Sequence, residues 1–405
     1  MKYIRTYGDY NSWKLDYSNP DRGFRLAPTL YRYPHGKDNI LLENDDPRKH
    51  GDSTYMEIYL DSDTEFSFYI GNAPGGTQTI RDCKVNWGDG NGGSTRLTAD
   101  DKGFKLSHNY KAGSYSIELY AIEDYSIIGD TTNFRSLISH PNSIKRVILG
   151  SGVVSIGEQA FSECSSITSV HIPNSVISIG ESAFDGCSSL TSVYIPESVT
   201  SIGGAFYNCT SLTSVYIPES VTSIGGAFYN CTSLTSIYIP EGVTTIEDGV
   251  FADCTSLTSV YIPKSTTTIE DGVFKNCTSL TSIYIPEGVT SIGSTTYEGV
   301  FEGCSSLTSI YIPRSVTSIG RNAFKGCSSL TSIDIPESVT SIGENAFDDC
   351  LLTHISSLNT TAPTIGNDVF ANIPTNGTLH IKPGATGYDA WLSKLPSGWR
   401  IVEDL

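Results

Sequence analysis

The sequence predicts a mainly β protein with short helical turns, built as a repeat solenoid of about ten 22–23-residue coils that follows a small N-terminal β-sandwich. Two observations carry this prediction. A phenylalanine–cysteine motif recurs at nearly constant spacing through the C-terminal two-thirds of the chain. Between residues 53 and 125, short segments alternate apolar and polar residues and are separated by glycine-rich turns.

The repeat is marked by nine cysteines in one repeat position, 22, 23 or 27 residues apart, each with a phenylalanine three residues before it. A unit this short cannot bury its own apolar face, so stacked neighbours must join their faces into one core. The cysteines are Cys164, Cys187, Cys209, Cys231, Cys254, Cys277, Cys304, Cys327 and Cys350. The phenylalanines are Phe161, Phe184, Phe206, Phe228, Phe251, Phe274, Phe301, Phe324 and Phe347, and Phe370 continues their series.

One unit, residues 183–203, reads AFDGCSSLTSVYIPESVTSIG. We expect Val193 and Ile195 to point inward from one strand of a parallel ladder, with neighbouring strands about 4.8 Å apart. Pro196 ends this strand because proline has no N–H to give the ladder. Gly203 marks the turn into the next Ala-Phe-x-x-Cys segment, where we expect a single helical turn.

This unit contains the L-x-x-L-x-L pattern of a leucine-rich repeat as Leu190, Val193 and Ile195. The motif A-F-x-x-C-x-x-L-x-x-I-x-I-P-x-x-V-x-x-I-G closely resembles the BspA-like leucine-rich-repeat family over about 210 residues. The resemblance implies a solenoid that binds other molecules. Two coils are one residue short, at Gly203-Gly204 and at Gly225-Gly226, and residues 294–299 carry an insertion.

The β-rich segment before the repeats contains Trp87-Gly88-Asp89-Gly90, followed by the stretch His108 to Ile117, which reads HNYKAGSYSI. This pair of motifs resembles the PKD-type immunoglobulin-like fold over some 70 residues. The resemblance implies a spacer or adhesion module of the kind found outside cells. The residues 89–92 offer oxygen ligands for calcium but no distal glutamate, so we interpret Asp89 as shaping a turn.

These patterns divide the chain into five predicted segments. Residues 1–52 are polar and rich in tyrosine, and we interpret them as a docking arm, or alternatively as an irregular cap on the next domain. The PKD-like sandwich spans 53–125, a linker and N-terminal cap 126–142, the repeats 143–372 and a C-terminal cap 373–405. A cap is expected because the last coil of a solenoid would otherwise expose an unpaired edge.

The bulk properties exclude some classes of partner. The net charge of −18 disfavours nucleic acid and anionic membranes. No run of 18 apolar residues occurs, so we expect no membrane insertion. The first residues, MKYIRTYGDYNSW, lack the apolar region of a secretory signal, which leaves open a trimmed signal or another route out of the cell.

The cysteine column is interpreted as buried reduced thiols, with no disulfides, metal or cofactor. Cysteines in one repeat position lie parallel, one in each coil, and the C-x-x-C spacing of zinc sites is absent. Catalysis has little support either, because the seven histidines are scattered and no hydrolase, P-loop or dinucleotide motif occurs. We therefore expect the protein not to be an enzyme.

The candidate contact site is a column of outward-facing tyrosines flanked by glutamates. Exposed aromatic rings with a hydroxyl group suit a protein or glycan ligand, but rings in register can also stack and stabilise the ladder. The flanking charges can equally reflect charge balance along the ladder. The tyrosines are Tyr194, Tyr216, Tyr238, Tyr261, Tyr284 and Tyr311, and the glutamates are Glu197, Glu219 and Glu241.

The sequence thus leads to two functional hypotheses. In the first, the solenoid is an adhesion protein that binds a protein or glycan on a host-cell, bacterial or mucosal surface. In the second, it is a structural virion component, a phage fibre or decoration protein, anchored in an assembly through residues 1–52. An intracellular scaffold is a third option, which the unpaired cysteines would suit.

Overall fold

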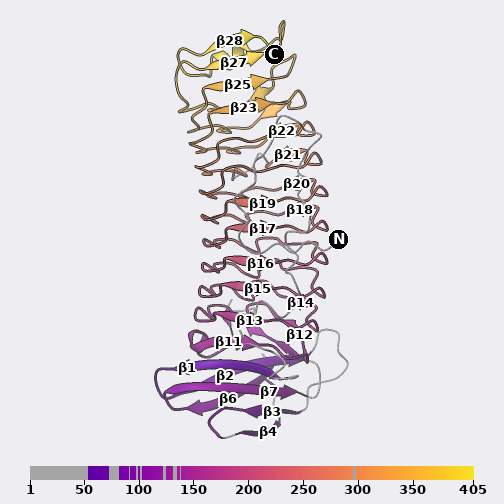
Figure 1. Ribbon diagram of the computed structural model, residues 1–405, viewed down its shortest axis with the longest axis vertical. Helices are drawn as coiled ribbons and strands as arrows, with labels where there is room; N and C mark the ends of the chain where they lie inside the picture. Colours follow the sequence, from indigo (N-terminus) through magenta and orange to yellow (C-terminus); the bar gives the residue numbers. More distant parts are fainter. Residues whose placement is uncertain are drawn as a thin grey trace, which may run out of the picture. The chain divides into compact units, whose positions relative to one another are not determined.

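The computed structural model describes residues 53–72, 82–90, 92–96, 99–100, 103–121, 125–130, 135–136, 138–294 and 298–405. All of them belong to one compact unit, His50–Leu405. The predicted docking arm, residues 1–52, lies outside the described residues. The predicted fold class is confirmed: the described chain is mostly β-structure with a stacked solenoid (Figure 1).

Two sheets form the N-terminal part. The strands of the first are β1 (Thr54–Leu60), β7 (Gly113–Ala121), β3 (Asp82–Asn86) and β4 (Gly92–Arg96), and they pair antiparallel. The second contains β2 (Thr64–Asn72), β6 (Gly103–Tyr110), β5 (Ala99–Asp100) and β8 (Tyr125–Ile127), also antiparallel. Apolar side chains from both sheets share one core, including Met56 and Phe66. A small ladder joins β9 (Gly129–Asp130) to β10 (Arg135–Ser136).

Both N-terminal sheets continue into the solenoid. After the 3₁₀ turn η5 (Pro141–Ser143), strand β11 (Ile144–Ile148) pairs antiparallel with β1 and parallel with β13 of the next coil. Strand β12 (Val153–Ile156) pairs parallel with β8 and with β14. The first coil therefore has no free edge toward the N-terminal sheets, which cover it as a cap.

The solenoid has two parallel ladders, one on each side of the coil, and each is interrupted where neighbouring strands do not pair. The first ladder contains β11, β13 (Ser169–His171), β15 (Ser192–Tyr194), β16 (Ser214–Tyr216), β17 (Ser236–Tyr238), β19 (Ser259–Tyr261), β23 (Ser332–Ile335), β25 (His354–Ser357), β27 (Thr378–Ile381) and β28 (Arg400–Glu403). The second contains β12, β14 (Ser178–Ile179), β18 (Thr245–Ile246), β20 (Thr268–Ile269), β21 (Ser291–Ile292), β22 (Ser318–Ile319), β24 (Ser341–Ile342) and β26 (Thr364–Ile365), with a single bridge between Ser201 and Ser223.

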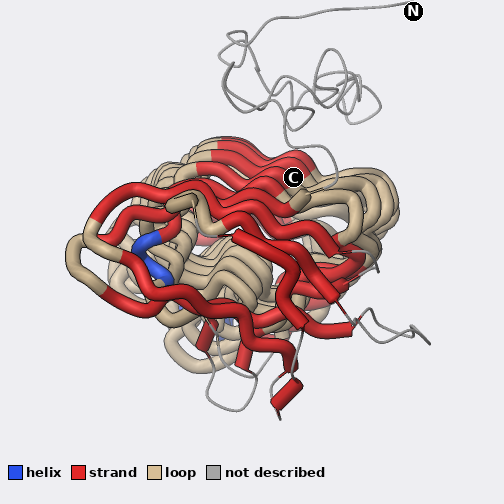
Figure 2. The backbone as a smooth tube through the Cα atoms, turned by 90° about the horizontal axis from the view of Figure 1, so that it is seen from below, coloured by secondary structure: helices blue, strands red, loops and turns tan. Residues whose placement is uncertain are grey.

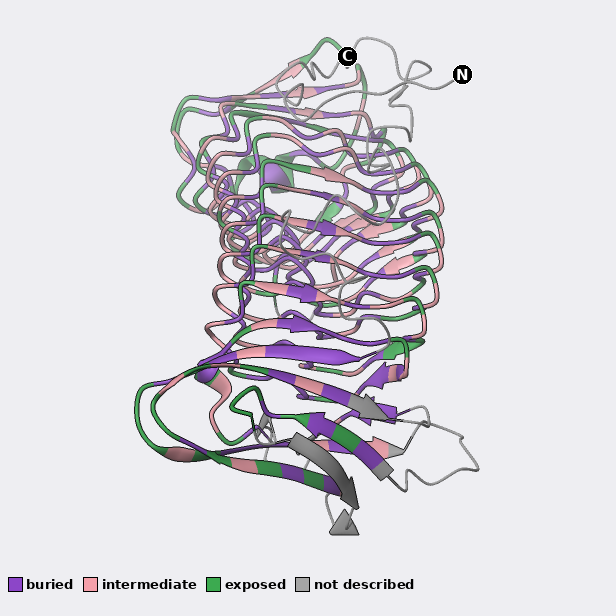
Figure 3. Ribbon diagram, turned by 60° about the horizontal axis from the view of Figure 1, so that its bottom comes forward, coloured by how far each residue is buried: buried purple, intermediate pink, exposed green. Residues whose placement is uncertain are grey.

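Stacked phenylalanine rings run through the core. From Phe161 to Phe370, neighbouring rings lie 5.3 to 6.0 Å apart and nearly parallel. The leucine, valine and isoleucine positions that the repeat predicted to point inward are buried in coil after coil, as Figure 3 shows. The apolar face that one coil cannot bury alone is thus closed by its neighbours.

The Ala-Phe-x-x-Cys segment is a pair of hydrogen-bonded turns, and the expected helical turn is wrong (Figure 2). In one coil the amide of Asp185 donates to Ser182 O and that of Cys187 donates to Phe184 O. The residue before each cysteine has a positive φ, as at Gly186 with 71° and Asn208 with 57°, which ends any helical path. These positions carry Gly, Asn, Asp or Glu, mostly residues that tolerate the left-handed region.

The C-terminal end of the solenoid is closed by aromatic residues around β27, the helix α1 (Asp389–Leu392) and β28. Trp391 packs on Phe370 with ring centres 5.5 Å apart, and its indole N–H donates to Pro363 O. The indole of Trp399 donates to Pro374 O. The stacked phenylalanines therefore end on a buried tryptophan whose polar atom is satisfied.

Candidate functional site

Six tyrosines project from the same face of six consecutive coils. Strand pairing places Tyr194 beside Tyr216 and Tyr238 beside Tyr261, and both pairs of rings stack at 5.0 Å within 8° of parallel. Tyr284 and Tyr311 hold the same repeat position in the next two coils. All six side chains are half-buried. We call these six residues the tyrosine column.

Each tyrosine hydroxyl of the central part of the column donates to a glutamate of the preceding coil. Tyr216 donates to Glu197 Oε1 at 2.9 Å, and Tyr238 donates to Glu219 Oε1 at 3.2 Å. The same bond joins Tyr261 to Glu241 at 2.8 Å and Tyr311 to Glu287 at 3.1 Å. These charge-assisted hydrogen bonds link neighbouring coils and fix the side chains in place. We call the tyrosine column with Glu197, Glu219 and Glu241 the tyrosine–glutamate face.

This geometry decides which part of each ring can meet a ligand. Where two rings stack, each covers one face of the other, and the edges are turned outward. Glu197, Glu219 and Glu241 are exposed and accept the hydroxyl bonds through their side-chain carboxyl oxygens. The tyrosine–glutamate face therefore offers ring edges and carboxylates on a flat, preorganised surface.

The comparisons with known proteins bear on the solenoid. Residues 136–227, 204–300 and 295–389 match the profile of the BspA-type leucine-rich repeat region, and together they are more than half of the chain. The chain belongs to the BspA-type leucine-rich-repeat family. The match begins at residue 136, after the end of the segment 53–125 that resembles the PKD-type fold. A search of curated proteins gives no match.

Several solved structures are similar to this BspA-type chain. A leucine-rich cell-surface protein from Faecalibacterium prausnitzii A2-165 is 27% identical over 68% of this chain and 86% of that one, with a TM-score of 0.39. A leucine-rich-repeat protein from Bacteroides ovatus is 24% identical over 81% of this chain and 100% of that one, with a TM-score of 0.41. A leucine-rich-repeat protein from T. pallidum is 29% identical, covering 51% and 83%, with a TM-score of 0.35.

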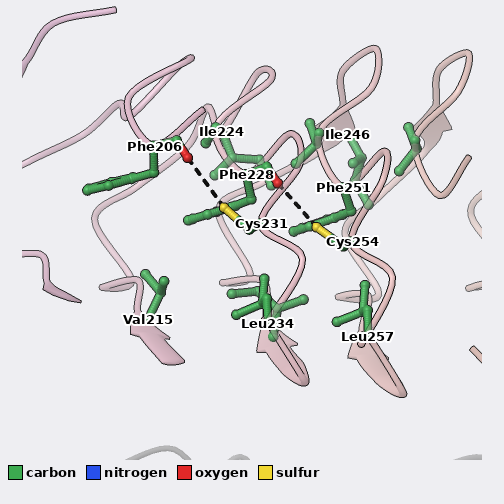
Figure 4. Close-up of a cluster of buried hydrophobic side chains, with 14 of the residues drawn as sticks. Phe206, Val215, Ile224, Phe228, Cys231, Leu234, Ile246, Phe251, Cys254 and Leu257 are labelled. Atoms are coloured by element: carbon green, nitrogen blue, oxygen red, sulfur yellow. Dashed lines mark hydrogen bonds between the residues drawn. The ribbon is translucent and has the colours of Figure 1, made fainter. Parts of the chain in front are cut away.

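The cysteines of the BspA-type repeats are buried free thiols, as the sequence predicts. Each thiol from Cys187 to Cys350 donates to the phenylalanine carbonyl of the preceding coil, for example Cys254 Sγ to Phe228 O at 3.1 Å (Figure 4). Burial raises the pKa of the Cys254 thiol to about 12. A thiol held protonated is neither a nucleophile nor a metal ligand, so the cysteine column holds coils together.

Among the described residues, no group of three or more His, Cys, Asp or Glu side chains is placed to hold a metal ion. No helix of the described part is long and apolar enough to cross a membrane. Asp89 of the Trp87–Gly90 turn pairs with His108 of β6: His108 Nε2 lies 2.7 Å from Asp89 Oδ2, and the imidazole ring stacks on Trp87.

Burial and the neighbouring glutamates raise the pKa of the column hydroxyls, that of Tyr238 from 10.0 to about 12. The folded chain then holds the phenol proton more tightly than the unfolded chain. The column's contribution to stability should be complete below pH 10 and should be lost as the pH rises from 10 through 12. Absorbance at 295 nm should show the column tyrosines ionising only as the pH rises well above 10. A single titration step at pH 10 with no loss of stability would contradict this expectation.

Proposed function

We propose that this protein is a non-enzymatic adhesion protein that works outside the cell, and that its tyrosine–glutamate face binds a protein partner. The observation that carries the proposal is the bonded column itself. Its aromatic side chains are fixed in place before any partner arrives, so little side-chain entropy is lost on binding. Interfaces draw much of their binding energy from such rigid tyrosines.

Charge indicates the kind of partner surface. Glu197, Glu219 and Glu241 lie in consecutive coils, with no basic side chain in the same repeat position until Lys264. A ligand with lysine or arginine residues in register would complement these exposed carboxylates, whereas nucleic acid would be repelled. In each stacked pair one face of each ring is covered by its neighbour, which leaves less ring face for a sugar to pack on and favours a protein partner.

The N-terminal sheets fit the role of a spacer. The proposal includes their resemblance to the PKD-type fold, which the Trp87–Gly90 turn supports. Tyr110 donates its hydroxyl to Trp87 O at 2.8 Å, and the imidazole of His108 lies between the Trp87 ring and Asp89. The turn motif and the later His-x-Tyr strand are thus bonded to each other as one structural element. This part would hold the repeats away from an anchoring point.

The test replaces Tyr216, Tyr238 and Tyr261 together by alanine and measures binding to bacterial cells, mucin and a panel of extracellular proteins. Wild type should bind a basic protein from that panel, and the triple variant should bind at least about 100-fold more weakly, since each central aromatic side chain at an interface is worth about 1–2 kcal/mol. Raising the salt from 0.05 to 0.5 M should also weaken wild-type binding.

Two controls separate a lost contact from lost folding. Tyr59→Ala removes a tyrosine that is 52% exposed in β1 and lies outside the tyrosine column, and it should leave binding unchanged. Circular dichroism and urea unfolding of the triple variant report whether the ladder survives. A folded triple variant that binds as well as wild type would refute the tyrosine–glutamate face as the contact surface.

A further inference from the structure

We infer that the solenoid carries a second binding site, for a neutral glycan, on the aromatic pair formed by Tyr207 and Tyr229. Both residues lie in turn segments between Phe and Cys, on a part of the coil that belongs to neither ladder. The site is separate from the tyrosine–glutamate face and does not depend on the function proposed for that face.

The aromatic pair occurs in the two coils that are one residue short. In these coils Gly204 and Gly226 precede the Ala-Phe step and have φ values of 64° and 62°. A Cβ on Gly226 would lie 2.9 Å from Cζ of Tyr207 and would overlap its hydroxyl oxygen. A Cβ on Gly204 would lie 3.3 Å from the same ring. The Tyr207 ring therefore lies against glycine backbone in a space that a side chain would fill.

The two rings are arranged differently from the tyrosine column. Their centroids are 5.8 Å apart and their planes are 83° apart, an edge-to-face contact rather than a stack. Tyr229 is 39% exposed, and it is the one tyrosine among the described solenoid residues that counts as exposed. An edge-to-face pair covers less of its ring faces than a parallel stack does. The open ring surface suits the apolar C–H face of a pyranose sugar, which packs flat on an aromatic ring.

Polar groups beside the rings provide hydrogen-bonding partners for sugar hydroxyls. The Asp253 carboxylate lies near the Tyr229 hydroxyl and raises its pKa, and Asn230 donates to Asn208 Oδ1 at 2.9 Å. Asn208 in turn donates to Asp185 Oδ1 at 2.8 Å. This chain of amides and carboxylates follows the coils alongside the rings and is held in place by its own bonds. Such fixed polar groups next to an apolar platform give a binding site its orientation.

The charges near the pair select against acidic sugars. Glu181 and Asp185 lie close enough to Tyr207 to raise the pKa of its hydroxyl, after burial as the larger cause. The nearby cation Lys275 forms an ion pair with Glu298 at 2.5 Å. A sialylated or sulfated glycan would meet uncompensated carboxylates, so the ligand class is a neutral hexose or N-acetylhexosamine polymer.

Affinity electrophoresis tests this site with the full chain. Native gels would contain galactomannan, mixed-linkage β-glucan or a soluble chitin derivative, with heparin as the anionic comparison. Wild type should be retarded by at least one neutral glycan and not by heparin. Tyr229→Ala should weaken that retardation about tenfold or more, which corresponds to about 1.4 kcal/mol. Tyr229→Phe keeps the ring and should stay within about threefold of wild type.

The matched control is Tyr59→Ala, which removes another exposed tyrosine of the same chain and should migrate like wild type. Circular dichroism checks that each variant is folded. The inference is overturned if no neutral glycan retards the wild type, if heparin alone does, or if Tyr229→Ala and Tyr59→Ala behave alike.

Discussion

Phe228→Ala should lower the free energy of unfolding by about 3–5 kcal/mol, the usual cost of truncating a buried phenylalanine. The Phe228 ring is completely buried and lies between Phe206 at 6.0 Å and Phe251 at 5.9 Å. Its removal breaks two ring contacts at once and leaves a cavity that the rigid neighbouring coils cannot close. Urea unfolding followed by circular dichroism measures the loss.

The position of this residue in the stack adds a second expected effect. In a solenoid each coil contacts only its neighbours, so cooperativity depends on every interface between coils. A weakened interface at Phe228 should separate the chain into two parts that unfold at different urea concentrations. The same truncation at Phe370, next to Trp391 at the C-terminal end, should destabilise that end without dividing the transition.

Phe228→Leu is the matched control, because it keeps most of the volume and should cost about 1.5 kcal/mol or less. If alanine cost no more than leucine at this position, the cavity left by the missing volume would not be the source of the loss. The Cys254 thiol donates to the backbone carbonyl of Phe228, so this hydrogen bond should be kept in both variants.

The solenoid could be predicted from the sequence because its repeat leaves little freedom. Once Phe184 and Cys187 recur at the same spacing in coil after coil, only one stacking register keeps both columns buried. The reduced state of the cysteines followed from the same reasoning. The turn segment was misjudged, although the Gly, Asn and Asp residues before the cysteines already indicated left-handed backbone.

The joining of the N-terminal sheets to the first coil could not be predicted. The pairing of β8 with β12 and of β1 with β11 brings together segments that no periodic pattern connects. Such pairing is decided by which edges remain open after each part has folded. The boundaries of the five predicted segments therefore stay predictions.

For the candidate site, the sequence predicted which tyrosines share a face but not what their hydroxyls contact. The partner of Tyr216 is Glu197, which lies in the preceding coil, and only the stacking brings the two within 2.9 Å. The Tyr-x-x-Glu spacing occurs in four of the six coils of the tyrosine column, but it does not show that a hydroxyl reaches the glutamate of the preceding coil. The aromatic pair of Tyr207 and Tyr229 could not be predicted, because it depends on how the Tyr207 ring lies against Gly204 and Gly226.

Gly343→Ala should lower the free energy of unfolding by about 3 kcal/mol, at the upper end of what overpacking a core position costs. Gly343 follows the buried isoleucine of β24, and its Cα lies against the backbone of the preceding coil. A Cβ there would lie 2.5 Å from Arg321 N and 2.6 Å from Gly320 C. These backbone atoms are held between neighbouring coils and cannot move away from the new methyl group as a flexible side chain could. The two coils must therefore separate locally.

Gly225→Ala provides the comparison, because Gly225 holds the same place after an isoleucine in one of the shortened coils. Its Cβ would meet only side-chain atoms of Glu247, at 3.6 Å or more. Alanine should fit here and should stabilise the fold by about 0.4–1 kcal/mol, since it restricts the unfolded chain. Urea unfolding of both variants decides the matter: equal losses would mean that the glycines serve backbone freedom alone, and a loss only at Gly343 would mean that they set how closely the coils approach.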